Sequence, residues 1–521
     1  MLLYRLIFYI EQRLELCYNI YKLITKITKG DNKMKTRKVL IVLLCVILCG
    51  LMFTACESPE TTGGVEPTPI PSATAESEEA KIAMKAGDVY RAFVWNNYEE
   101  NQFVDGTSLG VRAEDYRQRW LDFQQQYDVT ITWVANPNPS NWMDAVLSPA
   151  AAGNPLADIY HMGGPFAITS SLGYGGTAFG SLYEDLSRYS EYTNFDDNRY
   201  WDVNAIESVG WYSGKNYIVV PHEEGFASIS LNQVTFFNKA IVSAAGYSPE
   251  IIYEWYKNGE WTFEKFSEVA LACADPDKEL YGYPITQNGF VISALIAANG
   301  GAILTPDEKG IPKFTADSNE SLYAINYFLD ECKKPNVVCM LDNGMSQNES
   351  KLFANGTVGL MVTYANRVVE IYENQDLDYG VVLPPKGPNA TDYISEKNWF
   401  SPYSVFKGHE NPAGVVQCLS LYLCAAVPMD SVEQTMLLEG EIQSYFRDKE
   451  SIQSIKDSAD KSQTTSYMAY WDLSEGGLGF GTIAIYNAQK WITGESTPEI
   501  DYAATKEIAN KMISDLFKDK K

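Results

Sequence analysis

Aromatic and polar side chains lie at the ends of several expected strands, where they could contact a ligand. Apolar, β-branched runs predict strands over 89–95, 157–160 and 358–362. Residues at the carboxyl ends of strands gather at one edge of an α/β sheet, which is where such folds bind ligands. The residues in this position are Trp95, Asn96, His161, Tyr364, Asn366 and Arg367.

These side chains suit a neutral sugar better than an anion. Aromatic faces pack against apolar C–H patches, and planar polar groups bond to hydroxyls. The chain holds 11 Trp and 34 Tyr. Trp471, which precedes the glycine-rich loop 476–479, is a further candidate contact. That loop follows no clear strand and lacks a downstream acid for a ribose, so we do not interpret it as a nucleotide site.

Motifs for catalysis or metal binding are missing from the sequence. It contains three His residues and no CxxC pair, HExxH motif, nucleophile elbow or P-loop. Five cysteines follow Cys56, an odd and sparse set that favours free thiols over a disulfide framework, although Cys332 and Cys339 are close enough in sequence to pair across a loop. We therefore expect no catalytic residue, metal or cofactor.

Charge divides the chain into a basic leader and an acidic body. The 521 residues are 45% hydrophobic and carry a formal net charge of −26. Residues 1–55 contribute +6 and the remainder −32. An acidic body of this kind repels nucleic acid, so a nucleic-acid partner is not expected. The apolar content is ample for a large core and excludes wholesale disorder.

The leader is similar to a bacterial lipoprotein signal. A basic stretch over 34–38 precedes an uncharged run over 39–53, which is too short to span a membrane comfortably. Small residues then lead to Cys56, which the resemblance marks as the lipidated N-terminus of the mature protein. We interpret 1–33 as a start-site extension and 34–55 as the signal peptide. An uncleaved signal anchor is the alternative, and both place the body outside the cytoplasm on a membrane tether.

Composition and periodicity predict the organisation of the mature chain. Residues 56–85, rich in Pro, Thr, Ser and Glu, are expected to be a disordered linker. Beyond them, strands alternate with helices, which implies parallel pairing with helical crossovers. Further strands are expected at 129–134, 217–221, 228–237 and 379–383. Helices are expected at 115–127, 142–152, 263–274 (with Thr262 as N-cap), 412–426, 431–446, 483–492 and 500–517.

The body resembles the extracellular solute-binding proteins of ABC importers, in the family that includes the maltose-type sugar-binding proteins. The resemblance covers roughly 86–521 and rests on blocks in the family's order. They are Trp120-Leu121-Asp122-Phe123, the run 150–159, Gly214–Pro221, Trp261-Thr262-Phe263, Asn299-Gly300-Gly301, the run 353–361, Pro384–Pro388 and Trp491–Pro498.

This resemblance implies an α/β, two-lobed periplasmic-binding-protein-like fold of type II, with discontinuous lobes joined by hinge crossings. Expected crossings lie near 222–228, 399–404 and 450–465. The implied parts are 86–224 and 399–455 for lobe 1, and 225–398 and 456–521 for lobe 2. Closure of the lobes on ligand is the implied switch.

Function and partners follow from the same resemblance. It implies a monomer, lipid-anchored through Cys56 at the extracellular face of the membrane of a Gram-positive-type bacterium. Such a protein delivers a small solute, here expected to be an oligosaccharide, to ABC permease subunits. The family places a carboxylate near the first crossing, which points to Glu223 or Glu224, and Trp399 begins the second crossing.

Two other functions remain open at this level. A surface glycosidase would need two carboxylates roughly 5–10 Å apart, and an acidic chain cannot exclude such a pair. A ligand sensor or adhesin that reuses the binding fold is the other alternative.

Overall fold

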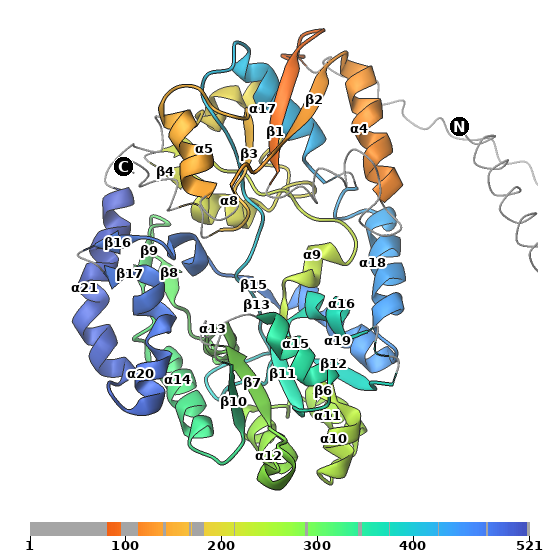
Figure 1. Ribbon diagram of the computed structural model, residues 1–521, viewed down its shortest axis with the longest axis vertical. Helices are drawn as coiled ribbons and strands as arrows, with labels where there is room; N and C mark the ends of the chain where they lie inside the picture. The colour runs from red at the N-terminus through yellow and green to blue at the C-terminus, as the bar shows by residue number, and fades with distance from the viewer. Residues whose placement is uncertain are drawn as a thin grey trace, which may run out of the picture. The chain divides into compact units, whose positions relative to one another are not determined.

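The computed structural model describes residues 81–94, 113–138, 142–165, 168, 182–212, 214–286, 290–341, 346–372, 374, 376–425, 427–475 and 478–517. They form the two-lobed α/β fold that the resemblance implies (Figure 1). The expected signal peptide, Cys56 and most of the expected linker lie outside these residues. Of the linker, residues 81–85 are described, and Ala83 N–H donates to Gln417 Oε1 (2.7 Å).

Lobe 1 is built on a four-stranded sheet of order β14-β3-β1-β2. Strands β1 (Val89–Val94), β2 (Thr130–Ala135) and β3 (Ile159–His161) run parallel, while β14 (Tyr403–Val405) is antiparallel to β3. Helices α4 (Ala113–Tyr127) and α5 (Trp142–Ala151) connect the parallel strands. The parallel pairing with helical crossovers is therefore confirmed. The other elements of lobe 1 are η5 (Leu186–Tyr192), α8 (Val203–Val209), β4 (Trp211–Tyr212), β5 (Lys215–Asn216) and α17 (Pro412–Tyr422).

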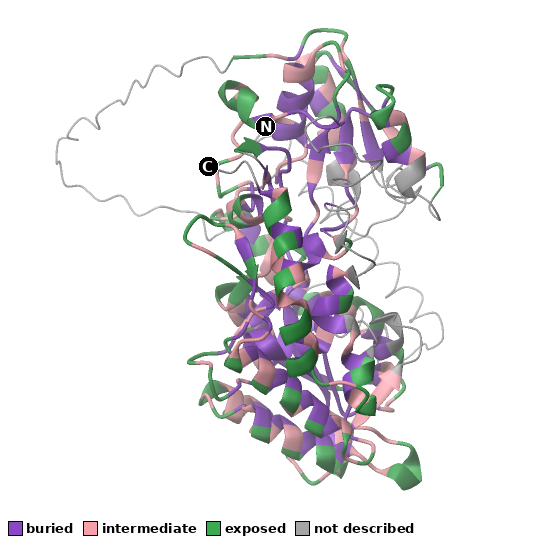
Figure 2. Cartoon of the chain, turned by 90° about the vertical axis from the view of Figure 1, so that its left-hand side faces the viewer, coloured by how far each residue is buried: buried purple, intermediate pink, exposed green. Residues whose placement is uncertain are grey.

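Lobe 2 has a central antiparallel sheet of order β11-β6-β12, made of Leu360–Tyr364, Gln233–Asn238 and Tyr379–Val382. All six residues of β6 are buried. Val234 and Phe236 belong to one apolar cluster and Phe237 to another, so the sheet is covered on both faces. Figure 2 shows buried residues in the strands and on one side of many helices, with exposed residues on the other.

Helices and short ribbons surround this sheet. The ribbons are β7 (Tyr283–Thr286) with β10 (Val338–Leu341), β8 (Leu304–Pro306) with β9 (Pro312–Phe314), and β16 (Ser474–Glu475) with β17 (Leu478–Gly479). The helices are α10 (Lys239–Ala244), α11 (Pro249–Lys257), α12 (Phe263–Cys273), α13 (Phe290–Ala298), α14 (Asn319–Cys332), α15 (Ser346–Ala354), α16 (Val368–Ile371), α18 (Val432–Tyr445), α19 (Lys449–Asp460), α20 (Ala488–Thr493) and α21 (Pro498–Leu516). The short turns are η6 (Pro276–Lys278), η7 (Ala365–Arg367), η8 (Tyr467–Tyr470) and the π-helical η9 (Thr482–Tyr486). No described helix is long and apolar enough to cross a membrane.

Two expected strands are wrong. Residues 217–221 form no continuous strand, because only Val219 and Pro221 make isolated bridges there, to Tyr403 and Trp201. The alternating sequence over 228–237 predicts a single strand, but its first part is a short helix, α9 (Ala227–Ser230), and β6 begins only at Gln233. The reason is local hydrogen bonding. The Ser228 hydroxyl donates to Gly225 O (2.7 Å) and the Ser230 hydroxyl to Ala227 O (3.0 Å), contacts that compete with a strand ladder.

Extended segments join the lobes. The segment 395–405 starts with β13 (Ser395–Lys397), which pairs with β15 (Ser462–Thr464), and ends with β14 in the lobe 1 sheet. The Ser395 hydroxyl donates to Gln233 O (2.6 Å), which fixes its first residue to lobe 2. Helix α19 packs against β12, so the expected boundary between parts at 455 falls inside this helix.

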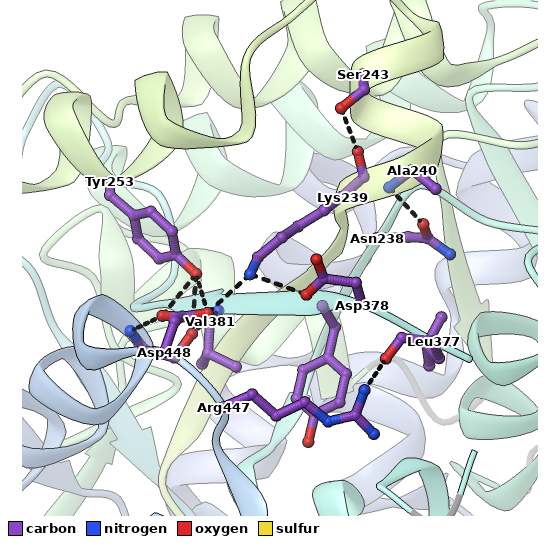
Figure 3. Close-up of polar contacts among 12 residues, drawn as sticks. Asn238, Lys239, Ala240, Ser243, Tyr253, Leu377, Asp378, Val381, Arg447 and Asp448 are labelled. Atoms are coloured by element: carbon purple, nitrogen blue, oxygen red, sulfur yellow. Dashed lines mark hydrogen bonds and ion pairs between the residues drawn. The ribbon is translucent and has the colours of Figure 1, made fainter. Parts of the chain in front are cut away.

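A polar cluster fixes the start of α19 to lobe 2 (Figure 3). Asp448 is the N-cap of α19 and accepts from Ser451 N–H (2.7 Å). Lys239 Nζ lies 2.9 Å from both Asp448 Oδ2 and Asp378 Oδ1. The Tyr253 hydroxyl donates to Asp448 Oδ2 (3.0 Å). The cap and the cation therefore share one carboxylate.

This cluster predicts an acid-sensitive contribution to stability. Asp448→Ala should lower the free energy of unfolding by about 1–3 kcal/mol, because a cap and a half-buried ion pair are lost together. Burial alone would raise the pKa of Asp448, but Ser451 N–H and Lys239 hold it below 3.8. The contribution is thus complete above pH 3.8 and is lost as the pH falls through the lower native pKa.

Denaturant unfolding at pH 7 and at acid pH tests this prediction. Asp378→Ala is the matched control, because the Asp378 side chain is 64% exposed and its ion pair is worth about 0–1 kcal/mol. Equal losses for the two variants at pH 7 would contradict the account.

Candidate functional site

Two of the predicted contacts, Trp95 and Asn96, lie outside the described residues, since β1 ends at Val94. The other eight are described.

His161 is the last residue of β3 and stacks on Tyr403. The ring centroids are 4.6 Å apart and the planes differ by 14°. The two residues are register partners, because β14 pairs with β3. The stack therefore fixes the imidazole at the carboxyl end of the strand, as the strand-end argument expects.

Glu223 faces a group of polar side chains that come from separate parts of the chain. Burial raises the pKa of Glu223, while Lys397, His161 and a hydrogen bond with Ser401 offset part of that rise. Two predicted residues, Glu223 and His161, are thus brought together. Lys397 is itself held by Asp202, with 3.5 Å between Nζ and Oδ2. The group formed by His161, Glu223, Lys397, Ser401 and Tyr403 is called the crossing cluster below.

Glu224 is 5% exposed and has a different partner from its neighbour. Its Oε1 lies 3.8 Å from Arg119 Nη1, and Arg119 also donates to Cys424 O (2.8 Å). Glu224 therefore ties α4 to the crossing, and Glu223 is the acid at the crossing cluster.

Tyr364, Asn366 and Arg367 lie on lobe 2. The strand begins and ends two residues later than expected, so Tyr364 ends β11 rather than following it. The Tyr364 hydroxyl donates to Asn398 Oδ1 (2.5 Å), and Arg367 Nη1 lies 2.6 Å from Glu370 Oε1. Asn366 Oδ1 is buried and accepts no hydrogen bond within the described part of the chain. This oxygen is thus an unused acceptor that is covered by the surrounding protein.

The two predicted tryptophans differ in their surroundings. Both are half-buried and pack against the main apolar cluster. A Cβ at Gly481 would lie only 2.4 Å from the indole of Trp471, so the backbone covers one face of that ring. Trp399 lies in the segment 395–405, between Lys397 and Ser401 of the crossing cluster. Trp399 is therefore the stronger stacking candidate.

Sequence reasoning missed Lys397, Ser401 and Tyr403. The sequence did contain a signal. Lys397, Ser401 and Tyr403 alternate with Trp399 along the chain, and alternate residues of an extended segment share a side. Their closeness to Glu223 and His161, however, depends on pairings between distant parts of the chain.

The charges of these residues are balanced. Each basic side chain named above has a carboxylate partner: Lys397 has Asp202, Arg367 has Glu370 and Arg119 has Glu224. Among the described residues, no group of three His, Cys, Asp or Glu is placed to hold a metal ion. What the arrangement offers is aromatic surface, an amide oxygen, a hydroxyl and a largely buried carboxyl. These groups can bind hydroxyls and C–H patches.

The family model described as bacterial extracellular solute-binding protein matches residues 110–423. No curated protein matches the sequence.

Solved structures with a similar fold share little sequence with this chain. A cyclic alpha-maltosyl-1,6-maltose binding protein from Arthrobacter globiformis aligns with a TM-score of 0.58 at 15% identity, over 82% of this chain and 100% of that one. An ABC substrate-binding protein from Listeria monocytogenes, in complex with cycloalternan, has a TM-score of 0.52 at 16% identity over 82% and 99%. UgpB from Mycobacterium tuberculosis, in complex with glycerophosphocholine, has a TM-score of 0.54 at 12% identity, over 82% of this chain and 99% of that one.

The two adjacent glutamates should differ in their effect on stability. Glu224→Gln should lower the free energy of unfolding by about 1–2 kcal/mol, because Arg119 loses its charged partner. Glu223→Gln should leave it unchanged or raise it at pH 7.5, because burial disfavours the ionised carboxylate that it replaces. Denaturant unfolding of the two variants provides the comparison. The assignment is wrong if Glu223→Gln is the more destabilising change.

Proposed function

The chain belongs to the family of bacterial extracellular solute-binding proteins, and we propose that its ligand is a neutral oligosaccharide, captured between the lobes and delivered to an ABC permease. The proposal includes the anchor: lipidation at Cys56 holds the protein at the extracellular face of the membrane. Capture does not require chemistry on the ligand, so no catalytic role is assigned.

The observation that carries the choice of ligand is that the basic side chains named at the candidate site, all of them described residues, lie beside carboxylates. An anionic ligand needs an available guanidinium or ammonium group, but Lys397, Arg367 and Arg119 each already lie beside a carboxylate. Separating such a pair to bind an anion leaves the carboxylate uncompensated. A neutral, hydroxyl-rich ligand avoids this cost.

The polar groups at the site suit hydroxyls. Glu223 beside Ser401 and the unused acceptor of Asn366 supply hydrogen bonds. Trp399 supplies an aromatic face for the C–H side of a sugar ring. Two of the structural neighbours are described with cycloalternan and with cyclic alpha-maltosyl-1,6-maltose, which supports the same class. The neighbour described with glycerophosphocholine makes a zwitterion the competing ligand to test.

Ligand binding is tested with tryptophan fluorescence of a fragment that starts after Cys56 and keeps every described residue. The titrants are linear and cyclic glucans, monosaccharides, glycerophosphocholine and peptides. We expect a saturable change with one class of glycan, weak dependence on salt, and recovery of the glycan intact. Shortened glycan would indicate an enzyme, and a response to glycerophosphocholine or peptides alone would overturn the sugar assignment.

Trp399→Ala should weaken the affinity for that glycan by at least about two- to tenfold, since an aromatic contact is worth about 0.5–1.5 kcal/mol beyond the area that it buries. Trp255→Ala is the matched control. Trp255 lies on α11 beside Lys265, with 4.9 Å from the ammonium to the ring, and its loss should leave the affinity unchanged. Calorimetric titration measures both variants. Equal affinities for Trp399→Ala and the unmodified protein would remove Trp399 from the site.

A further inference from the structure

A carboxyl group is buried at the point where the second crossing leaves lobe 2. Glu396, the middle residue of β13, is 2% exposed. Its hydrogen-bond partners are all neutral and come from separate elements. They are Ser293 Oγ on α13 (2.6 Å to Oε2), Gln233 Nε2 on β6 (3.1 Å to Oε2), Asn398 Nδ2 (3.1 Å to Oε2) and Thr465 Oγ1 (2.9 Å to Oε1).

The hydroxyl of Ser293 has two possible acceptors but only one proton. Ser293 Oγ lies 2.6 Å from Glu396 Oε2 and 2.9 Å from the carbonyl oxygen of Phe290. A hydroxyl has one proton and can donate to only one of these two acceptors. If the carboxyl carries a proton, Glu396 donates to Ser293 and Ser293 donates to Phe290 O, so both contacts become hydrogen bonds. An ionised Glu396 takes the serine proton, so Phe290 O loses the serine donor and keeps the amide of Gln233, whose Nε2 lies 3.5 Å away.

Two series of contacts connect Tyr364 with the carboxyl group of Glu396. Asn398 donates through Nδ2 to Glu396 and to Tyr467 Oη (2.9 Å), which turns its Oδ1 toward the Tyr364 hydroxyl. On the other side, the ring of Phe290 lies 6.2 Å from the ring of Tyr364. Both routes from Tyr364, through Asn398 and through Phe290 with Ser293, end at Glu396.

Among the residues that the structure describes, the groups that face Glu396 do not supply a positive charge. Tyr364 on β11 and Tyr467 on η8 are the titratable neighbours, and burial raises the pKa of each above 10. Helix α13, β6 and β15 contribute Ser293, Gln233 and, just past β15, Thr465. Lys397, next in sequence, is engaged with Asp202 instead. Burial raises the pKa of Glu396 to about 7, and Ser293, Thr465 and Asn398 oppose that rise.

We propose that Glu396 is a proton-carrying positioning residue: its carboxylic acid proton completes the hydrogen-bond network that holds the hydroxyl and ring of Tyr364 in the candidate site. The relevance of Tyr364 to ligand rests on the proposed function, whereas the proton and its link to Tyr364 do not. Ligand affinity therefore weakens as the pH rises through about 7, because ionisation removes the proton that orders the network.

The proton is tested first, without ligand. Glu396→Gln removes the titratable group with little change of shape, and a side-chain N–H that points to Ser293 also faces the donors of Gln233 and Asn398. The infrared difference between the unmodified protein and this variant should contain a protonated carboxyl band at pH 6 that disappears by pH 8.5. The free energy of unfolding of the unmodified protein, relative to the variant, should fall as the pH rises from 4.5 to about 7 and then level off. The proposal is overturned if the infrared difference contains no protonated carboxyl band and the difference in the free energy of unfolding does not depend on pH.

A double-mutant cycle with Tyr364→Phe tests the positioning. In the unmodified protein, removal of the Tyr364 hydroxyl should cost more stability at pH 6 than at pH 8.5, whereas in Glu396→Gln the cost should be the same at both. A cost that is independent of pH in both backgrounds would contradict the link. Thr465→Val provides a second variant should Glu396→Gln fold poorly, because loss of the Thr465 hydroxyl donor should move the infrared titration to higher pH.

The experiments distinguish a wrong role for Glu396 from a wrong ligand assignment. If no glycan binds, the sugar assignment falls, while the infrared band and the cycle still decide the role of Glu396. If a glycan binds with an affinity that is the same at pH 6 and pH 8.5, the sugar assignment stands and the positioning role is overturned.

Discussion

The fold depends on one short extended segment that is bonded to both lobes. Residues 395–397 pair with β15, and Ser395 bonds to the backbone of β6, while residues 403–405 pair with β3 in the other sheet. Tyr403 also exchanges two backbone hydrogen bonds with Val219 (3.0 and 2.8 Å), which ties the second crossing to the approach of the first. The residues between these anchors have no sheet on either side.

The absence of sheet pairing over residues 398–402 explains why polar side chains gather around them. Buried polar groups must find partners when no ladder supplies them. Asn398 and Glu396 satisfy each other and their neighbours on the lobe 2 side, and Ser401 pairs with Glu223 near lobe 1. The groups that permit an extended chain to cross between the lobes are thus the same groups that lie around the candidate site. A buried network of this kind is sensitive to the loss or gain of a single proton.

Much of the fold could be predicted, because its signals are local. Alternating strands and helices predicted the parallel sheet of lobe 1, and Thr262 was correctly predicted as a cap, accepting from Lys265 N–H. Trp261, which directly precedes this cap, is fully buried. The strand expected over 228–237 failed because serine hydroxyls bond to the backbone one turn earlier, which a pattern of alternating apolarity does not reveal.

The candidate site could be predicted only as separate positions. Strand ends and the family resemblance identified His161, Glu223 and Trp399, but not that Lys397 and Ser401 lie with them. Glu396 gave no signal at all, since an acid between Ser395 and Lys397 is typical of a solvated loop. Its burial results from contacts with Gln233 and Ser293, which are 163 and 103 residues away in sequence. Only the tertiary structure brings such partners together.

A crystal structure of the protein with the glycan that binds most tightly would show where the ligand lies. We expect the sugar to contact Glu223 and Trp399 at the crossings and Asn366 on lobe 2, while the ion pairs of Lys397 and Arg367 stay intact. A ligand bound elsewhere, or one that displaces Asp202 from Lys397 to place an anionic group there, would contradict this expectation.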